Sequence, residues 1–188
     1  MLDRTLLEAT FSRAVSFDRY LASDQSRAGG WQTVYDRVVL SEVQKAEIAG
    51  FTREMKVLVV SGSWCGDCVQ QGPMLERIAQ ANPLIDLRWV DRDAEEELSS
   101  RLKICGGGRV PMVVFAAEDF DVCAITGDRT LSRYRGLARR QLGPSCELPW
   151  AEIPVDESVA VLQEWLNEFE RVQWMLRLST RLRQKHGD

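Results

Sequence analysis

The stretch Met55-Lys56-Val57-Leu58-Val59-Val60-Ser61-Gly62-Ser63-Trp64-Cys65-Gly66-Asp67-Cys68 decides the fold of this chain. Its first part, Met55–Val60, is a short apolar run rich in β-branched residues, which predicts a strand buried on both faces. The residues from Cys65 to about Ala81 have apolar side chains at helical spacing. The sequence therefore predicts a strand, a short turn and a helix that carries two cysteines on its first turn.

Cysteines three residues apart on one helical turn face the same side, at a separation compatible with a disulfide. Cys65 also lies near the unpaired N–H groups and the positive end of the helix dipole, which favour its thiolate. Such a thiolate can attack a substrate disulfide, and the second thiol can then attack the mixed disulfide and release the reduced product. We therefore expect Cys65 to be the catalytic nucleophile and Cys68 the catalytic resolving thiol.

Composition excludes several other classes of protein. The chain has 188 residues, 45% of them hydrophobic, which is enough for a real core. Its 24 Lys and Arg against 28 Asp and Glu give a net charge of −4, so we expect no nucleic acid partner. The one histidine, His186, lies in a basic tail, which argues against histidine triads and histidine-rich metal sites.

Two features of the sequence bear on its location. Charged residues interrupt Met1–Phe11 where a secretory signal would need an apolar run, and no later stretch reaches transmembrane length. The five cysteines are irregularly spaced, which argues against a disulfide-stapled secreted scaffold. We expect a cytoplasmic protein with no membrane partner.

The rest of the chain predicts an alternation of helices and strands. Residues 1–23 have the pattern of one amphipathic helix that Ala28-Gly29-Gly30 interrupts, and Ser41 with Gln44 predicts a capping box. The further strands expected are Leu84–Val90, Met112–Ala116 and Asp121–Thr126, the last two as a hairpin, and the further helices are Ala94–Leu102, Arg129–Leu142 and Asp156 to about Arg183, with a loop over Gly143–Pro154. This order predicts an α/β protein with a mixed sheet and helices on both faces.

Two other interpretations of the cysteine pair remain. A C-x-x-C can be half of a zinc site, but the chain has no second such pair, and Cys105, Cys123 and Cys146 stand apart without histidine partners. The pair can also be two packing cysteines, although Gly66 and Asp67 would be poor core neighbours.

Several separated features resemble the thioredoxin family. These are the strand, the string Trp64-Cys65-Gly66-Asp67-Cys68, Pro73 five residues after the second cysteine, and Val110-Pro111 at the start of the third strand. The resemblance implies a thioredoxin fold, a central mixed sheet flanked by helices, here with extra N-terminal helices and a long C-terminal helix. It also implies that Pro111 is a cis proline facing the dithiol and that the Val110 backbone pairs with substrate. We expect Trp64, Gly66 and Asp67 to line the substrate site with them.

The function that this implies is dithiol-disulfide exchange that reduces protein or small-molecule disulfides, with electrons from a reductase or a low-molecular-weight thiol. No bound metal or organic cofactor is expected. The alternative is a thioredoxin-like binding or redox-sensing module without turnover. We expect residues 1–50 to form a helical extension packed on the core, and residues 51–188 to form the thioredoxin-like domain, with an insertion at about 128–153.

Two positions depart from the family pattern. The residue before the second cysteine is Asp67 where ordinary thioredoxins have proline. Its carboxylate either caps the helix or faces solvent, or it points inward and raises the pKa of the thiols. The family's buried acid, six residues before the first cysteine, is replaced by Val59. Our hypothesis is that Asp67 or a water accepts the proton of the resolving thiol instead.

Other features have simpler interpretations. Cys105 is either a packing cysteine or a third redox thiol, and Gly106-Gly107-Gly108 lacks the features of a phosphate-binding loop. The basic run Arg129, Arg133, Arg135, Arg139 and Arg140 is interpreted as a solvated helix face, and Asp91, Asp93, Glu95, Glu96 and Glu97 as an acidic first turn. Trp150 and Trp165 are interpreted as packing aromatics.

Overall fold

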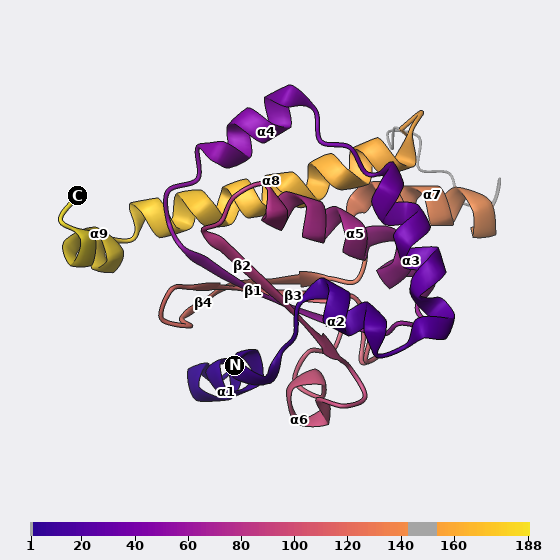
Figure 1. Ribbon diagram of the computed structural model, residues 1–188, viewed down its shortest axis with the longest axis horizontal. Coiled ribbons are helices and arrows are strands. Elements are labelled where there is room, and N and C mark those ends of the chain that lie inside the picture. The colour runs from indigo at the N-terminus through magenta and orange to yellow at the C-terminus, as the bar shows by residue number, and fades with distance from the viewer. Residues whose placement is uncertain (1, 143–153) are drawn as a thin grey trace.

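The structure is a computed structural model that describes residues 2–142 and 154–188 (Figure 1). The helices are α1 (Arg4–Arg13), α2 (Phe17–Ala22), α3 (Gln25–Arg37), α4 (Glu42–Ala49), α5 (Gly66–Gln80), α6 (Glu96–Ser99), α7 (Leu131–Leu142), α8 (Glu157–Leu178) and α9 (Thr180–His186). The strands are β1 (Met55–Ser61), β2 (Ile85–Asp91), β3 (Met112–Ala117) and β4 (Val122–Gly127). Every predicted strand is present, with its ends shifted by one residue or less.

The four strands form one mixed sheet in the order β2-β1-β3-β4. β1 and β2 are parallel, and β3 is antiparallel to both of its neighbours, β1 and β4. β3 and β4 form the expected hairpin. Figure 1 shows α5 and α8 on one face of the sheet and α1 and α6 on the other. The mixed sheet with helices on both faces is the predicted architecture, and the fold is that of thioredoxins.

Strand pairing brings three separate segments to one edge of the sheet. Val60, near the end of β1, lies opposite Met112 at the start of β3, and Met112 lies opposite Gly127 at the end of β4. The residues that follow β1, precede β3 and follow β4 must therefore meet. Gly127 is needed at this point, because a Cβ there would lie 2.5 Å from the Pro111 carbonyl oxygen. The cysteine helix begins at the same edge.

The N-terminal helices differ from the prediction in two ways. The single amphipathic helix expected over residues 1–23 is two helices, because Val15 leaves the helical path and forms an antiparallel bridge with Trp89 on the outer side of β2. The expected interruption at Gly29-Gly30 is also wrong, since α3 passes through both glycines. The fully buried Trp31 anchors α3, and tertiary packing outweighs the low helix propensity of glycine. The capping box of Ser41 and Gln44 is confirmed.

An aromatic cluster joins these helices to the sheet. Trp31 and Trp89 are fully buried with ring centroids 5.9 Å apart, and Phe17 and Tyr20 each contact both rings at 5.3–6.0 Å. Aromatic pairs of this kind contribute about 0.5–1.5 kcal/mol each beyond the area that they bury. The cluster therefore fixes α2 and α3 against β2 and next to the cysteine helix α5.

The C-terminal helix is interrupted where a continuous one was expected. α8 ends at Leu178, and Ser179 both leaves the helical conformation and caps α9 through its side chain. Trp165 is fully buried, as predicted, but Val159 and Met175 are exposed although both were expected to face inward. Trp150, Cys146 and all but the last residue of the loop expected over Gly143–Pro154 lie outside the described residues. None of the described helices is both long enough and apolar enough to span a bilayer.

Candidate dithiol site

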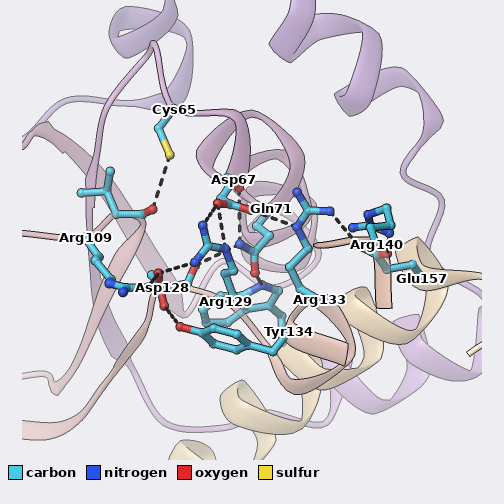
Figure 2. Close-up of polar contacts among 12 residues, drawn as sticks. Cys65, Asp67, Gln71, Arg109, Asp128, Arg129, Arg133, Tyr134, Arg140 and Glu157 are labelled. Carbon is cyan, nitrogen blue, oxygen red and sulfur yellow. Dashed lines mark hydrogen bonds and ion pairs between the residues drawn. The ribbon is translucent and has the colours of Figure 1, made fainter. Parts of the chain in front are cut away.

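Cys65 lies at the start of the cysteine helix, where strand β1 has just ended. It is the N-cap residue of α5 and is half-buried, and in its protonated form its thiol donates to the Val110 carbonyl oxygen at 3.5 Å (Figure 2). A hydrogen bond from the Cys68 thiol, together with the backbone N–H groups of Cys68 and Asp67, lowers the pKa of Cys65 to about 6, against the opposing effects of burial and of the Asp67 charge. A large fraction of Cys65 is therefore thiolate at neutral pH.

Cys68 has the opposite character. Its side chain is fully buried in the first turn of α5, and both cysteines are free thiols. Burial, and then the neighbouring Cys65, raise the pKa of Cys68 far above the ordinary value of a thiol. Cys65 is therefore the accessible, ionised thiol, whereas Cys68 is a protected neutral thiol that can donate to it.

Two buried hydroxyl groups near Cys68 were missed by the sequence analysis. The hydroxyls of Ser61 and Tyr20 have no hydrogen-bond partner of standard geometry among the described residues. Ser61 nevertheless lies close enough to Cys68 to lower the pKa of that thiol, although burial and Cys65 raise it by more. Burial raises the pKa of Tyr20, and the charges of Cys68 and Cys65 raise it further. Ser61 ends β1 and Tyr20 lies on α2, and nothing in the sequence predicts that these two residues come close to the cysteines.

The remaining predicted substrate-binding residues surround Cys65. Val110 and Pro111 are buried, and the peptide bond between them is cis. Trp64 is 44% exposed and Gly66 is also exposed, so both are available to a bound molecule. These residues meet Cys65 because β3 begins at the sheet edge where β1 ends.

Asp67 neither caps the helix nor faces solvent. Its side chain is only 12% exposed, and the N-cap position of α5 belongs to Cys65. One carboxylate oxygen accepts from Arg129 Nη2 at 2.6 Å, and the other accepts from Arg133 Nε at 2.9 Å (Figure 2). The capping or solvated interpretation is therefore wrong. Both carboxylate oxygens of Asp67 are thus already bonded to guanidinium groups.

Asp128 is a second acidic group of this site that the sequence analysis missed. It follows Gly127 directly, through a cis peptide bond, and only 2% of it is exposed. Its carboxylate accepts from Tyr134 Oη, from Arg129 Nη1 at 2.9 Å and from Arg109 Nη1 at 3.3 Å. Burial acts to raise the pKa of Asp128, but these hydrogen bonds outweigh it and hold the pKa below the ordinary value. The one sequence signal that could have pointed to Asp128 is its position directly before Arg129, the first residue of the basic run.

The basic run is therefore not a solvated face throughout. Arg129 joins Asp67 to Asp128, Arg133 joins Asp67 to Glu157, and Arg140 also pairs with Glu157. These ion pairs connect α7 to α5 and α8. The predicted helix was correct apart from its start, but its charges form contacts that depend on tertiary structure and leave no periodic signal in the sequence.

A pocket of about 220 Å³ opens beside Cys65. Its lining residues come from the three segments that meet at the sheet edge: Trp64, Cys65, Asp67, Arg92, Gly108, Arg109, Val110, Asp128 and Arg129. Cys105, on the loop before this pocket, is exposed and has a positive φ of 49°, and its part in redox chemistry stays a prediction. Within residues 2–142 and 154–188, no group of three or more His, Cys, Asp or Glu side chains is arranged to hold a metal ion.

Known proteins resemble this chain in sequence and in fold. A family model described as Thioredoxin matches residues 14–131. The chain belongs to the thioredoxin family. A putative thioredoxin 2 of Streptomyces coelicolor is 34% identical over 80 residues, which are 41% of this chain and 58% of that protein. The match thus spans less than two thirds of the relative.

Two solved structures share the fold of this thioredoxin family member. One is a protein of unknown function from Pseudomonas aeruginosa, with a TM-score of 0.65 and 18% identity over 86% of this chain and 93% of that one. The other is an HIV epitope-scaffold protein, with a TM-score of 0.64 and 15% identity over the same shares of the two chains. At these identities, the likeness shows the fold alone.

Proposed function

We propose that this protein is a thiol-disulfide oxidoreductase that reduces disulfides through Cys65 and Cys68. The Cys65 thiolate attacks one sulfur of a substrate R–S–S–R, forms a Cys65–S–S–R bond and releases RS⁻, which takes a proton from water. Cys68 then gives its proton to water and attacks the Cys65 sulfur, which releases the second RS⁻ and leaves a Cys65–Cys68 disulfide. The two electrons come from the dithiol, and an external thiol or a reductase restores it.

The observation that carries this proposal is the unequal state of the two thiols. Cys65 has a pKa of about 6 and partial exposure, whereas Cys68 is fully buried and its pKa is raised. This combination suits a first attack by Cys65 and a second attack from inside the protein. Membership of the thioredoxin family supports an oxidoreductase function of this type. The exposed Trp64 and Gly66, beside Val110, Pro111 and Asp67, would contact the substrate.

The test is reduction of a protein disulfide by dithiothreitol, measured with and without catalytic amounts of this protein. We expect wild-type protein to accelerate the reaction, Cys65→Ser to remove the acceleration, and Cys68→Ser to accumulate a mixed disulfide at Cys65 that mass spectrometry detects. Cys123→Ser is the matched control, because Cys123 lies on β4 and does not line the pocket. Wild-type protein without turnover would contradict the proposal and favour the binding or sensing alternative.

A further inference from the structure

Three arginines line the pocket beside Cys65. Arg92, Arg109 and Arg129 all belong to its wall, with side chains that are 28%, 43% and 24% exposed. They come from different segments, one after β2, one before β3 and one after β4. Their convergence on the nucleophile follows from the strand pairing at this edge and not from a basic composition, since the whole chain has a net charge of −4.

Asp93, which is 62% exposed and does not line the pocket, pairs with Arg92 at 2.8 Å, but the two acidic residues that do line the pocket lie deeper than the arginines. The Asp67 and Asp128 side chains are only 12% and 3% exposed, and both are already bonded to guanidinium groups. Their charges therefore point into the protein, whereas the arginines reach solvent. A molecule that approaches Cys65 meets guanidinium groups first, and screening by water is weaker inside a concave pocket than on an open surface.

Two of these arginines are held next to the predicted substrate-binding residues. Arg92 lies over the Trp64 ring, 4.6 Å from its centroid. Its Nη1 donates to the Gly108 carbonyl oxygen at 3.0 Å, and its Nε and Nη2 each lie 2.8 Å from Asp93 Oδ1, which leaves one N–H on each of Nη1 and Nη2 for a ligand. Arg109 directly precedes Val110, and its one side-chain hydrogen bond within the described residues, to Asp128, uses Nη1 alone. As far as the described residues show, the other N–H donors of Arg109 are available to a ligand, because a guanidinium group has five.

From this arrangement we infer that the site prefers disulfides that carry a carboxylate close to the sulfur atoms. The inference rests on the proposed function and names its substrate class. A thiolate that attacks an anionic disulfide meets charge repulsion, and guanidinium groups at the pocket mouth offset it while they pair with the carboxylate. The pocket volume of about 220 Å³ admits one small acidic group next to the disulfide.

The chemistry of the step is unchanged by this preference. Cys65 attacks the sulfur of a carboxylate-bearing disulfide and releases one carboxylate-bearing thiolate, and Cys68 releases the second. The shared chemistry is a carboxylate near a disulfide, which can belong to a low-molecular-weight disulfide or to an acidic peptide. Arg109 and Arg92 are assigned as residues that determine specificity by binding this carboxylate.

A series of three small disulfides of similar length tests the inference. The probes are 3,3′-dithiodipropionate with two negative charges, bis(2-hydroxyethyl) disulfide with none, and cystamine with two positive charges. Since their intrinsic reactivities differ, the measured quantity is the ratio of kcat/KM between wild type and variant for each probe. We expect Arg109→Gln and Arg92→Gln to lower kcat/KM about 5- to 10-fold for dithiodipropionate and less than about 2-fold for the neutral probe, with no loss for cystamine.

The matched control is Arg171→Gln, which removes the same charge from a half-exposed arginine on α8 that does not line the pocket. It should leave all three ratios near one. Equal losses on all three probes in Arg109→Gln and Arg92→Gln would show a structural role only and overturn the inference, as would no loss on any probe. Failure of wild-type protein to reduce any probe would instead contradict the proposed function.

A second pair of probes separates the two sources of carboxylate. These are a disulfide-linked peptide with glutamates next to each cysteine and the same peptide with glutamines. A preference for dithiodipropionate without a preference for the glutamate peptide would assign the site to low-molecular-weight disulfides, whereas a preference in both series would extend it to acidic peptides. No charge preference in either series would overturn the inference.

Discussion

Cys65 and Cys68 are three residues apart in the chain, and yet their surroundings give the two thiols opposite properties. Cys65 lies at the open end of the helix and receives hydrogen bonds that favour its thiolate, whereas burial keeps Cys68 neutral. The spacing and the position at a helix start predicted the roles of both residues. These signals did not predict that the Ser61 hydroxyl lies near Cys68, because that proximity depends on how β1 and α5 pack.

The Ser61 hydroxyl should assist the second attack. Removing it in Ser61→Ala takes away a group that lowers the pKa of Cys68, so the pKa should rise further and fewer Cys68 thiolates should form. With 2,2′-dithiodipyridine in a single turnover, the first release of thiopyridone should keep its rate and the second should slow about 5-fold or more. Ser61→Thr keeps the hydroxyl and should retain the second phase. Equal rates of the second phase in wild type and Ser61→Ala would contradict this role.

Asp67 should hold the pKa of Cys65 higher than it would otherwise be. The Asp67 charge raises this pKa, so Asp67→Asn should move it below the wild-type value of about 6. Alkylation by iodoacetamide, followed against pH, should show a midpoint near pH 6 in wild type and a lower one in the variant, with alkylation about two- to threefold faster at pH 5.

The control for this experiment is Asp36→Asn, which changes an exposed acid on α3 and should leave the midpoint where it is in wild type. A higher midpoint in Asp67→Asn would show that the ion pairs with Arg129 and Arg133 matter more to Cys65 than the charge of Asp67 does.

At the scale of elements, the local signals were sufficient for β1, α5 and the capped helix α4, because apolar runs, helical spacing and a capping box act within a few residues. The local signals failed where contacts between segments far apart in the chain determine the structure. The glycines in α3 were expected to end a helix, but Trp31 in the aromatic cluster holds it. Asp67 on α5 pairs with Arg129, just before α7, and with Arg133 on α7, which are 62 and 66 residues away in the chain, and no periodic pattern encodes such pairs.

The contact between α3 and α5 gives a prediction about packing. A Cβ at Gly72 would overlap Trp31 Cζ3 and lie 3.0 Å from Trp89 Cη2, inside a filled core. Gly72→Ala should therefore lower the free energy of unfolding by about 3 kcal/mol, the upper part of the usual range for overpacking. Chemical denaturation followed by circular dichroism measures this change.

Gly29→Ala is the matched variant on the neighbouring helix. A Cβ at Gly29 meets nothing within 4 Å, and the residue lies inside α3. Alanine there should raise the free energy of unfolding by about 0.5–1 kcal/mol. A stabilising Gly72→Ala would contradict the close packing of Trp31 on α5.

At the scale of the whole molecule, we propose that residues 1–50 are a helical extension packed on the thioredoxin-like domain of residues 51–188. The support is a single hydrophobic cluster that contains residues of both parts, among them Leu7, Trp31, Phe115 and Trp165. Unfolding should therefore be one cooperative transition, with coincident curves from tryptophan fluorescence and far-ultraviolet circular dichroism. Two separated transitions would contradict a shared core and show an independently folding extension.

The central claim is that Cys65 and Cys68 form a reversible two-electron couple. The measurement that tests it most directly is a redox titration in thiol buffers, with alkylation and peptide mapping to identify which cysteines change state. We predict one two-electron transition confined to Cys65 and Cys68, with the other cysteines alkylated equally at every potential. A chain in which no Cys65–Cys68 disulfide forms at any accessible potential would contradict the exchange mechanism.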